Sequence, residues 1–136
     1  MNYAIVGCGL IGKKRLAGLP AGSKLVVACD TTLARAEELV KLAKTGHAVA
    51  DFKQAVADPQ VNAVIVATIN SVLAGVAAAA IRAGKHVIVE KPAGISVKQI
   101  DELIALAESM ASLSVSASIT VFIRRSAKRG RFLSPA

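Results

Sequence analysis

Apolar and polar residues alternate in blocks along the first hundred residues of this chain. Short apolar runs, typical of buried parallel strands, occur at residues 3–6, 24–29, 48–50, 61–68 and 86–90. Between them, apolar residues recur at helical spacing, which predicts helices over residues 10–19, 33–44, 52–57, 71–83 and 97–108. Strands that alternate with helices predict an α/β fold, a doubly wound parallel sheet with right-handed crossovers.

The first predicted strand runs into a glycine motif, G-x-G-x-x-G, at the point where a helix begins. Gly7 permits a tight turn, Gly9 lets a pyrophosphate approach the backbone, and Gly12 lets the helix pack closely on the strand. We assign cofactor binding to these glycines and to Leu10 and Ile11, which precede the last of them. The alternative is an ordinary glycine-rich turn between a strand and a helix.

An acidic residue ends the second predicted strand. Asp30 follows Gly12 at the spacing of the carboxylate that binds the adenosine ribose in dinucleotide sites. A carboxylate there repels a 2′-phosphate, so we expect NAD rather than NADP, although Arg35 weakens that preference. Asp30 could instead cap the next helix, but Thr31 and Thr32 are also available for capping.

Two later stretches carry a resemblance. Residues 66–70 read V-A-T-I-N and residues 83–92 read A-G-K-H-V-I-V-E-K-P. Together with the glycine motif and Asp30, they resemble the glucose–fructose oxidoreductase/inositol dehydrogenase family (Gfo/Idh/MocA) over residues 1–108. The resemblance implies a Rossmann-type domain and hydride transfer between a nicotinamide cofactor and a sugar, polyol or sugar-nucleotide hydroxyl.

The resemblance also implies roles for single residues. Thr68 and Asn70 would line the cleft on the nicotinamide side, and Glu90 would contact the cofactor ribose. Lys91 would be the catalytic residue that orients or polarises the reacting hydroxyl of the substrate. The alternative for Glu90 and Lys91 is a solvated surface pair.

Composition narrows the class of protein. The chain has 136 residues, of which 54% are hydrophobic and only 3% aromatic, as suits one domain with an aliphatic core. Cys8 and Cys29 stand alone in apolar runs, so we expect buried thiols, without a disulfide or a metal site. We see no signal peptide, and the apolar run at residues 72–81 is too short to span a bilayer, so we expect a cytoplasmic protein without membrane contact.

The net charge of +8 arises mostly after residue 108, where five Lys and Arg residues occur without an acid. The family resemblance stops there. Related chains continue with V-G-F-N-H-R-F-H-P-A into a second, α+β catalytic domain, whereas residues 117–125 read A-S-I-T-V-F-I-R-R. GGC TTC AAT CAC CGT TTT CAT CCG GCG encodes the family residues from glycine onward, and reading it one base later gives the observed stretch in full.

We therefore interpret residues 1–108 as a dinucleotide-binding domain and residues 109–136 as a basic tail translated out of frame from near Ser109. The tail contains a strand-like segment that could occupy the sheet edge of the sixth strand of the family. We expect the chain to be the cofactor-binding half of an oxidoreductase, inactive alone and without a specific nucleic-acid partner. The resemblance implies an oligomer for intact members of the family, which we do not expect of this chain. The alternative is a free-standing NAD-binding or regulatory module without catalysis.

Overall fold

The computed structural model describes residues 1–68, 70–90, 96–112, 118–122, 132 and 133. All five predicted strands are present, and two short strands follow them. The strands are β1 Asn2–Val6, β2 Lys24–Cys29, β3 His47–Val49, β4 Ala63–Val66, β5 His86–Glu90, β6 Ser118–Phe122 and β7 Phe132–Leu133. The helices are α1 Leu10–Ala17, α2 Leu33–Ala43, α3 Phe52–Ala57, α4 Asn70–Arg82 and α5 Val97–Ser112.

The element boundaries differ from the predicted ones where a local hydrogen bond decides them. Helix α1 ends at Ala17 instead of residue 19, because the N–H of Leu19 bonds the Leu16 carbonyl, three residues earlier, instead of continuing the α-helical pattern. Strand β4 is shorter than predicted, since the N–H of Val61 is used by a turn that bonds the Asp58 carbonyl. Helix α5 runs four residues past its predicted end, to Ser112.

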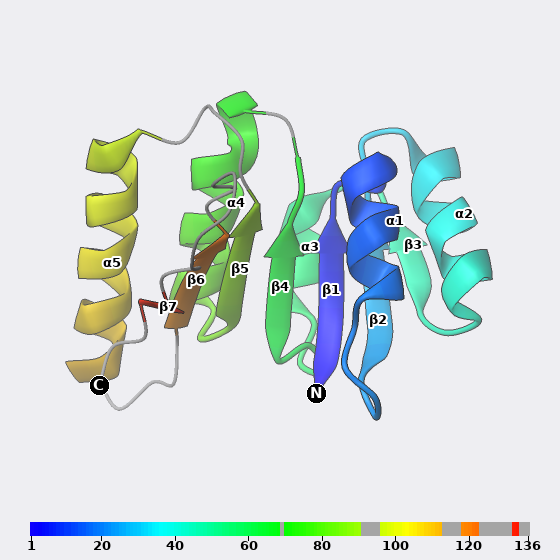
Figure 1. Cartoon of the computed structure of the whole chain (residues 1–136), viewed down its shortest axis with the longest axis horizontal. Helices are drawn as coiled ribbons and strands as arrows, with labels where there is room; N and C mark the ends of the chain where they lie inside the picture. Colours follow the sequence, from blue (N-terminus) through cyan, green and yellow to red (C-terminus); the bar gives the residue numbers. More distant parts are fainter. Residues whose placement is uncertain (69, 91–95, 113–117, 123–131, 134–136) are drawn as a thin grey trace, which may run out of the picture.

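The strands form one sheet in the order β3-β2-β1-β4-β5-β6-β7. The first six are parallel, and β7 pairs with β6 in the antiparallel direction. Figure 1 shows this sheet from the side of α1, with α2 and α5 at its opposite ends. The chain crosses from β3 over to β4, so the topological switch point lies between β1 and β4, where open α/β sheets bind ligands at the carboxyl ends of their strands.

Two apolar layers hold the helices on the sheet. Alternate residues of β1 point to opposite faces: Ala4 and Val6 pack with α3, α4 and α5, whereas Tyr3 and Ile5 pack with α1 and α2. The core is aliphatic, as predicted, and Ile5, Leu39 and Ile81 are among its fully buried side chains. Removing each such side chain from water stabilises the fold by roughly 1.5–3 kcal/mol.

The strand-like segment of the tail does join the sheet. Strand β6 pairs with β5 over its whole length, from His86 beside Ser118 to Glu90 beside Phe122. It thus occupies the edge at which the sequence suggested a sixth strand. Backbone pairing on a parallel edge needs little more than apolar alternation and no Pro, which residues 118–122 provide.

Candidate dinucleotide site

A cavity of about 470 Å³ opens at the carboxyl edge of the sheet, at the switch point. Residues from the ends of four strands and the loops after them line it. They include Gly7, Gly9, Asp30, Arg35, Phe52 and Thr68. The cavity brings together the glycine motif, the acid after β2 and the threonine after β4, which lie far apart in the sequence.

The three glycines of the motif meet different surroundings. Gly7 has a φ of +98°, and a Cβ there would lie 2.5 Å from the Ala67 carbonyl oxygen. A Cβ on Gly12 would collide with the Gly7 carbonyl oxygen, so this glycine allows close packing of α1 on the turn. A Cβ on Gly9 would meet nothing within 4 Å. Gly7 and Gly12 are therefore required by the fold itself, whereas Gly9 borders open space.

The N-terminus of α1 faces that open space and has no acidic side chain of its own beside it. Gly9 is the N-cap, no side chain caps the helix, and the first turn contains no acidic residue. The first N–H groups of a helix lack intrahelical acceptors and carry a partial positive charge. Leu10 is 71% exposed and Ile11 36% exposed beside them. This end of α1 has the donors and the space that a pyrophosphate needs.

Asp30 has both of its carboxylate oxygens engaged. Oδ2 accepts the N–H of Cys8 at 2.9 Å, and Oδ1 accepts the N–H of Thr32 at 2.8 Å. Thr32 is the N-cap of α2 but its side chain makes no capping hydrogen bond, so the expectation that a threonine hydroxyl would cap this helix is wrong. The aspartate accepts the N–H of this N-cap residue instead, and it lines the cavity as well.

Thr68 is the predicted site residue on the far side of the glycine turn. Its Oγ1 is buried and has no hydrogen-bond partner among the described residues, an arrangement that costs free energy unless a ligand supplies a partner. Asn70 begins α4 and Glu90 ends β5, both at the carboxyl edge, but their side chains lie outside the described part of the chain. Lys91 lies outside the described residues as well.

Sequence reasoning missed the wall of the cavity formed after β3. Ala50 and Phe52 line it there, and Val72 and Val76 of α4 line it from the side of β4. Their position after a predicted strand could have indicated them, because residues that follow a parallel strand lie at the same edge of the sheet as the glycine turn. The strand before them is only three residues long, which made that signal weak.

The two cysteines are buried thiols on opposite faces of the sheet, Cys8 on the side of α1 and α2 and Cys29 on the side of α3 to α5. Burial, followed by the charge of Asp30, raises the pKa of Cys8 to about 12 and that of Cys29 to about 11. Both thiols stay protonated at neutral pH, which leaves them unsuited to nucleophilic or metal-binding roles. Among the described residues, no group of three potential metal ligands gathers.

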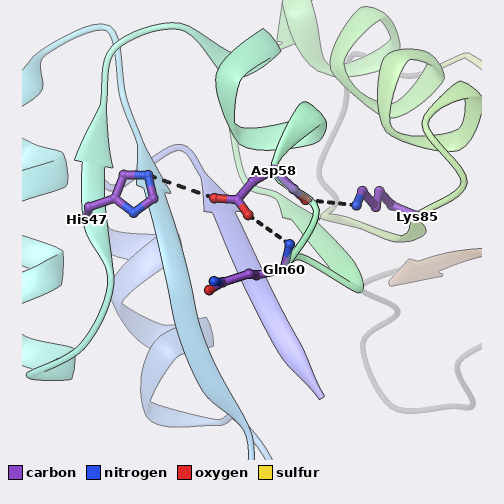
Figure 2. A network of polar contacts seen from close by, with 4 residues as sticks. All are labelled: His47, Asp58, Gln60 and Lys85. Atoms are coloured by element: carbon purple, nitrogen blue, oxygen red, sulfur yellow. Dashed lines mark hydrogen bonds and ion pairs between the residues drawn. The ribbon is translucent and has the colours of Figure 1, made fainter.

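The two histidines lie at the amino edge, away from the cavity. His86 opens β5, and the imidazole of His47 at the start of β3 lies 4.0 Å from the Asp58 carboxylate. Figure 2 shows this contact together with Lys85, whose ammonium group donates to the Asp58 carbonyl at 2.9 Å. Neither histidine is placed to act on a ligand in the cavity.

Comparison with known proteins identifies the family. The family described as "Oxidoreductase family, NAD-binding Rossmann fold" (Gfo/Idh/MocA) matches residues 1–117. The match continues past residue 108, at which the resemblance in sequence stops. This chain belongs to the Gfo/Idh/MocA family. An inositol 2-dehydrogenase of Salmonella typhimurium is 33% identical over 108 residues, which are 76% of this chain and 32% of that protein. The chain thus spans about a third of the length of the curated relatives it matches.

Solved structures of a dehydrogenase and a reductase share the fold. The WlbA dehydrogenase from Chromobacterium violaceum, in complex with NADH and UDP-GlcNAcA, superposes with a TM-score of 0.78 at 22% identity, over 90% of this chain and 34% of that one. Biliverdin reductase from Synechocystis, in complex with biliverdin and NADP⁺, gives 0.73 at 24% identity, over 88% and 37%. Nicotinamide dinucleotides of both kinds therefore occur among the structural neighbours. No helix in the described part of this chain is long and apolar enough to cross a membrane.

Proposed function

We propose that this chain is the dinucleotide-binding part of an oxidoreductase that moves a hydride between a nicotinamide cofactor and a hydroxyl of a sugar, polyol or sugar nucleotide. The observation that carries the proposal is the open space at Gly9, at the bare N-terminus of α1 and inside a cavity that Asp30 lines. A pyrophosphate fits such a place because backbone donors face it and no Cβ stands in the way. Family membership supports the same proposal.

Within this proposal the cofactor is NAD rather than NADP. The Asp30 carboxylate lines the cavity and is held by two protein N–H groups, so a 2′-phosphate would meet a fixed negative charge. Each oxygen keeps a further acceptor position for a ribose hydroxyl. Arg35, also on the cavity wall, opposes the preference without removing the carboxylate.

The roles of the remaining site residues belong to the same proposal. Thr68 and Asn70 contact the nicotinamide side, Glu90 contacts the ribose, and Lys91 polarises the substrate hydroxyl. The buried Thr68 hydroxyl without a partner among the described residues supports the first of these roles. We place the protein in the cytoplasm, where reducing conditions suit its two unpaired thiols.

Cofactor titration tests the proposal. We expect the full chain to bind NADH more tightly than NADPH, by about 1–3 kcal/mol, in a titration that follows nicotinamide fluorescence. Gly9→Val should leave the melting temperature nearly unchanged, because its side chain enters open space, and should abolish binding by filling the pyrophosphate position. Gly75→Val is the matched control, since Gly75 also borders open space but lies within α4. Equal binding of both cofactors would refute the NAD preference, and undiminished binding by Gly9→Val would refute the site.

A second candidate, a free-standing NAD-binding or regulatory module, uses only the cavity at the carboxyl edge of the sheet, which residues of this domain line. It predicts the same cofactor binding, so the nucleotide sequence that follows codon 136 separates the two. A second domain encoded in another reading frame supports the oxidoreductase half. Non-coding sequence supports the module.

We also propose that residues from near Ser109 onward are translated out of frame. The support is the nine-residue correspondence of residues 117–125 with the shifted family codons, and the family match ends at residue 117, where that correspondence begins. The domain boundary at residue 108 belongs to this proposal, although α5 and the family match both continue past it.

A further inference from the structure

The carboxylate of Asp30 joins two loops that are distant in the sequence. Its Oδ2 accepts the N–H of Cys8, inside the glycine turn, and its Oδ1 accepts the N–H of Thr32, at the start of α2. The residue before it acts on the same turn, because the Cys29 carbonyl accepts the N–H of Gly7 at 2.8 Å. Two consecutive residues at the end of β2 therefore hold two consecutive residues of the turn.

The opposite side of the turn is held by β4. The Val6 carbonyl accepts the N–H of Ala67 at 2.7 Å, and the backbone at Ala67 leaves no room for a side chain on Gly7. Two bonds from the end of β2 reach past Gly7 to Cys8, the residue next to Gly9, where the open space begins: Asp30 Oδ2 accepts the Cys8 N–H, and the Cys29 carbonyl accepts the Cys8 thiol at 3.3 Å. The thiol bond holds the Cys8 side chain, whereas the Asp30 carboxylate holds the Cys8 backbone N–H, from which the chain continues to the first donors of α1.

We propose that Asp30 is a positioning residue, which fixes the glycine turn against the start of α2 before any cofactor arrives. This inference rests on the proposed function in that the fixed turn is the cradle of the dinucleotide. Asp30 then has two roles, recognition of the ribose and positioning of the glycine turn, and the second role does not require a bound ribose. Because the carboxylate has one hydrogen bond on each oxygen from the protein, it also cannot turn away to admit a 2′-phosphate.

Amide hydrogen exchange in the free, full-length chain tests this role directly. We expect the amides of Cys8 and Thr32 to be protected without cofactor. In Asp30→Asn the side chain keeps one acceptor oxygen, and its NH₂ group only donates, so the two amides cannot both retain their present bonds. At least one of them should exchange about tenfold faster or more.

The matched control is Asp58→Asn. Asp58 also accepts the N–H two residues ahead, that of Gln60 at 2.8 Å, but at the amino edge of the sheet. This variant should leave Cys8 exchange unchanged. The amide of Ile65, in the buried strand β4, is the internal reference, because a general loss of stability would accelerate its exchange as well and a positioning role would not.

Two results would overturn the inference: a Cys8 amide that exchanges in the free wild-type chain at the rate of an unstructured amide, or an Asp30→Asn variant with both exchange rates unchanged. The first needs no variant, so the test survives a variant that fails to fold. The proposed function fails separately. A protected Cys8 amide in a chain that binds neither NADH nor NADPH would preserve the positioning role and remove the cofactor.

Discussion

The three glycines of one motif separate into two kinds when their surroundings are compared. Gly7 and Gly12 are enclosed by backbone, so any side chain there disturbs the fold before it disturbs a ligand. Gly9 has neither a strained φ nor a neighbour within 4 Å, so the fold gives no reason for a glycine at this position. Gly75 also borders open space, but Gly9 in addition stands at the N-terminus of a helix and lines the cavity, and this combination indicates a ligand.

At the same scale, the buried thiols make stability depend on pH in the alkaline range. The folded pKa values of Cys8 and Cys29, about 12 and about 11, exceed the ordinary value of 9.0, so folding favours the protonated form. This contribution is complete below pH 9 and is lost as the pH rises through the folded values. We expect the free energy of unfolding to fall by roughly 1 kcal/mol per pH unit and thiol between about pH 9 and 11.

Urea unfolding at a series of pH values measures this slope, with the double variant Cys8→Ala, Cys29→Ala as the control. The control should be less stable at pH 7, because it leaves small cavities, and should have a shallower slope above pH 9. Equal slopes in both proteins would show that the thiols are accessible to solvent.

Part of the residue-level picture was predictable from the sequence. The glycines, Asp30 and Thr68 were identified because their chemistry depends on residue type and spacing. The bond from the Cys8 N–H to Asp30 was not predicted, because a backbone donor leaves no mark on residue type. The cavity wall at Phe52 was missed for a related reason, since it depends on how a very short strand is placed in the sheet.

At the scale of elements, the stretch A-G-K-H before β5 has a structural task apart from the site. Gly84 has a φ of +78° and ends α4. The Lys85 ammonium then donates to the carbonyls of Asp58 and Val61, at 2.9 and 2.7 Å, in the connection between α3 and β4. The loop before β5 thereby fixes the loop before its neighbour β4, as Figure 2 shows for Asp58.

We predict that Lys85→Met lowers the free energy of unfolding by about 1–3 kcal/mol, because two partly buried carbonyls lose a charged donor. Lys98→Met is the matched control, since the Lys98 side chain is 86% exposed and makes only a 3.9 Å contact with Glu102. It should change stability by less than about 0.5 kcal/mol. Denaturant unfolding compares the two, and an equal effect of both substitutions would contradict the structural role of Lys85.

Elements were predicted better than their ends. Hydrophobic period identifies a strand or a helix, but a terminus depends on a few hydrogen bonds. Reciprocal bonds begin α5: the Ser96 hydroxyl accepts the Gln99 N–H while the Gln99 side chain accepts the Ser96 N–H. The end of α1 depends on the bond from the Leu19 N–H to the Leu16 carbonyl, which no residue pattern specifies.

At the scale of the whole molecule, the positive charge of the basic tail has two interpretations, a nucleic-acid site or a product of the shifted reading frame. All five of its Lys and Arg residues fall within residues 124–131, after β6. We predict that deleting residues 123–136 leaves the affinity for NADH within about twofold, because β6 and the cavity remain. The deletion should remove any attraction to DNA, which in the full chain should be weak, salt-dependent and independent of sequence. Preferential binding of one DNA sequence by the full chain would contradict the out-of-frame proposal.

The last prediction is that the 136-residue chain binds cofactor without turning over substrate. Hydride transfer needs a hydroxyl held against the nicotinamide and a base to take its proton. Both histidines lie at the amino edge, and both thiols are buried and protonated. Among the assigned residues this leaves Lys91 as the one side chain to orient a sugar and to take its proton. Absorbance at 340 nm should show no NADH formation across a panel of sugars and polyols, with Lys91→Ala indistinguishable from wild type. Robust oxidation that disappears in Lys91→Ala would mean that this chain carries a complete active site.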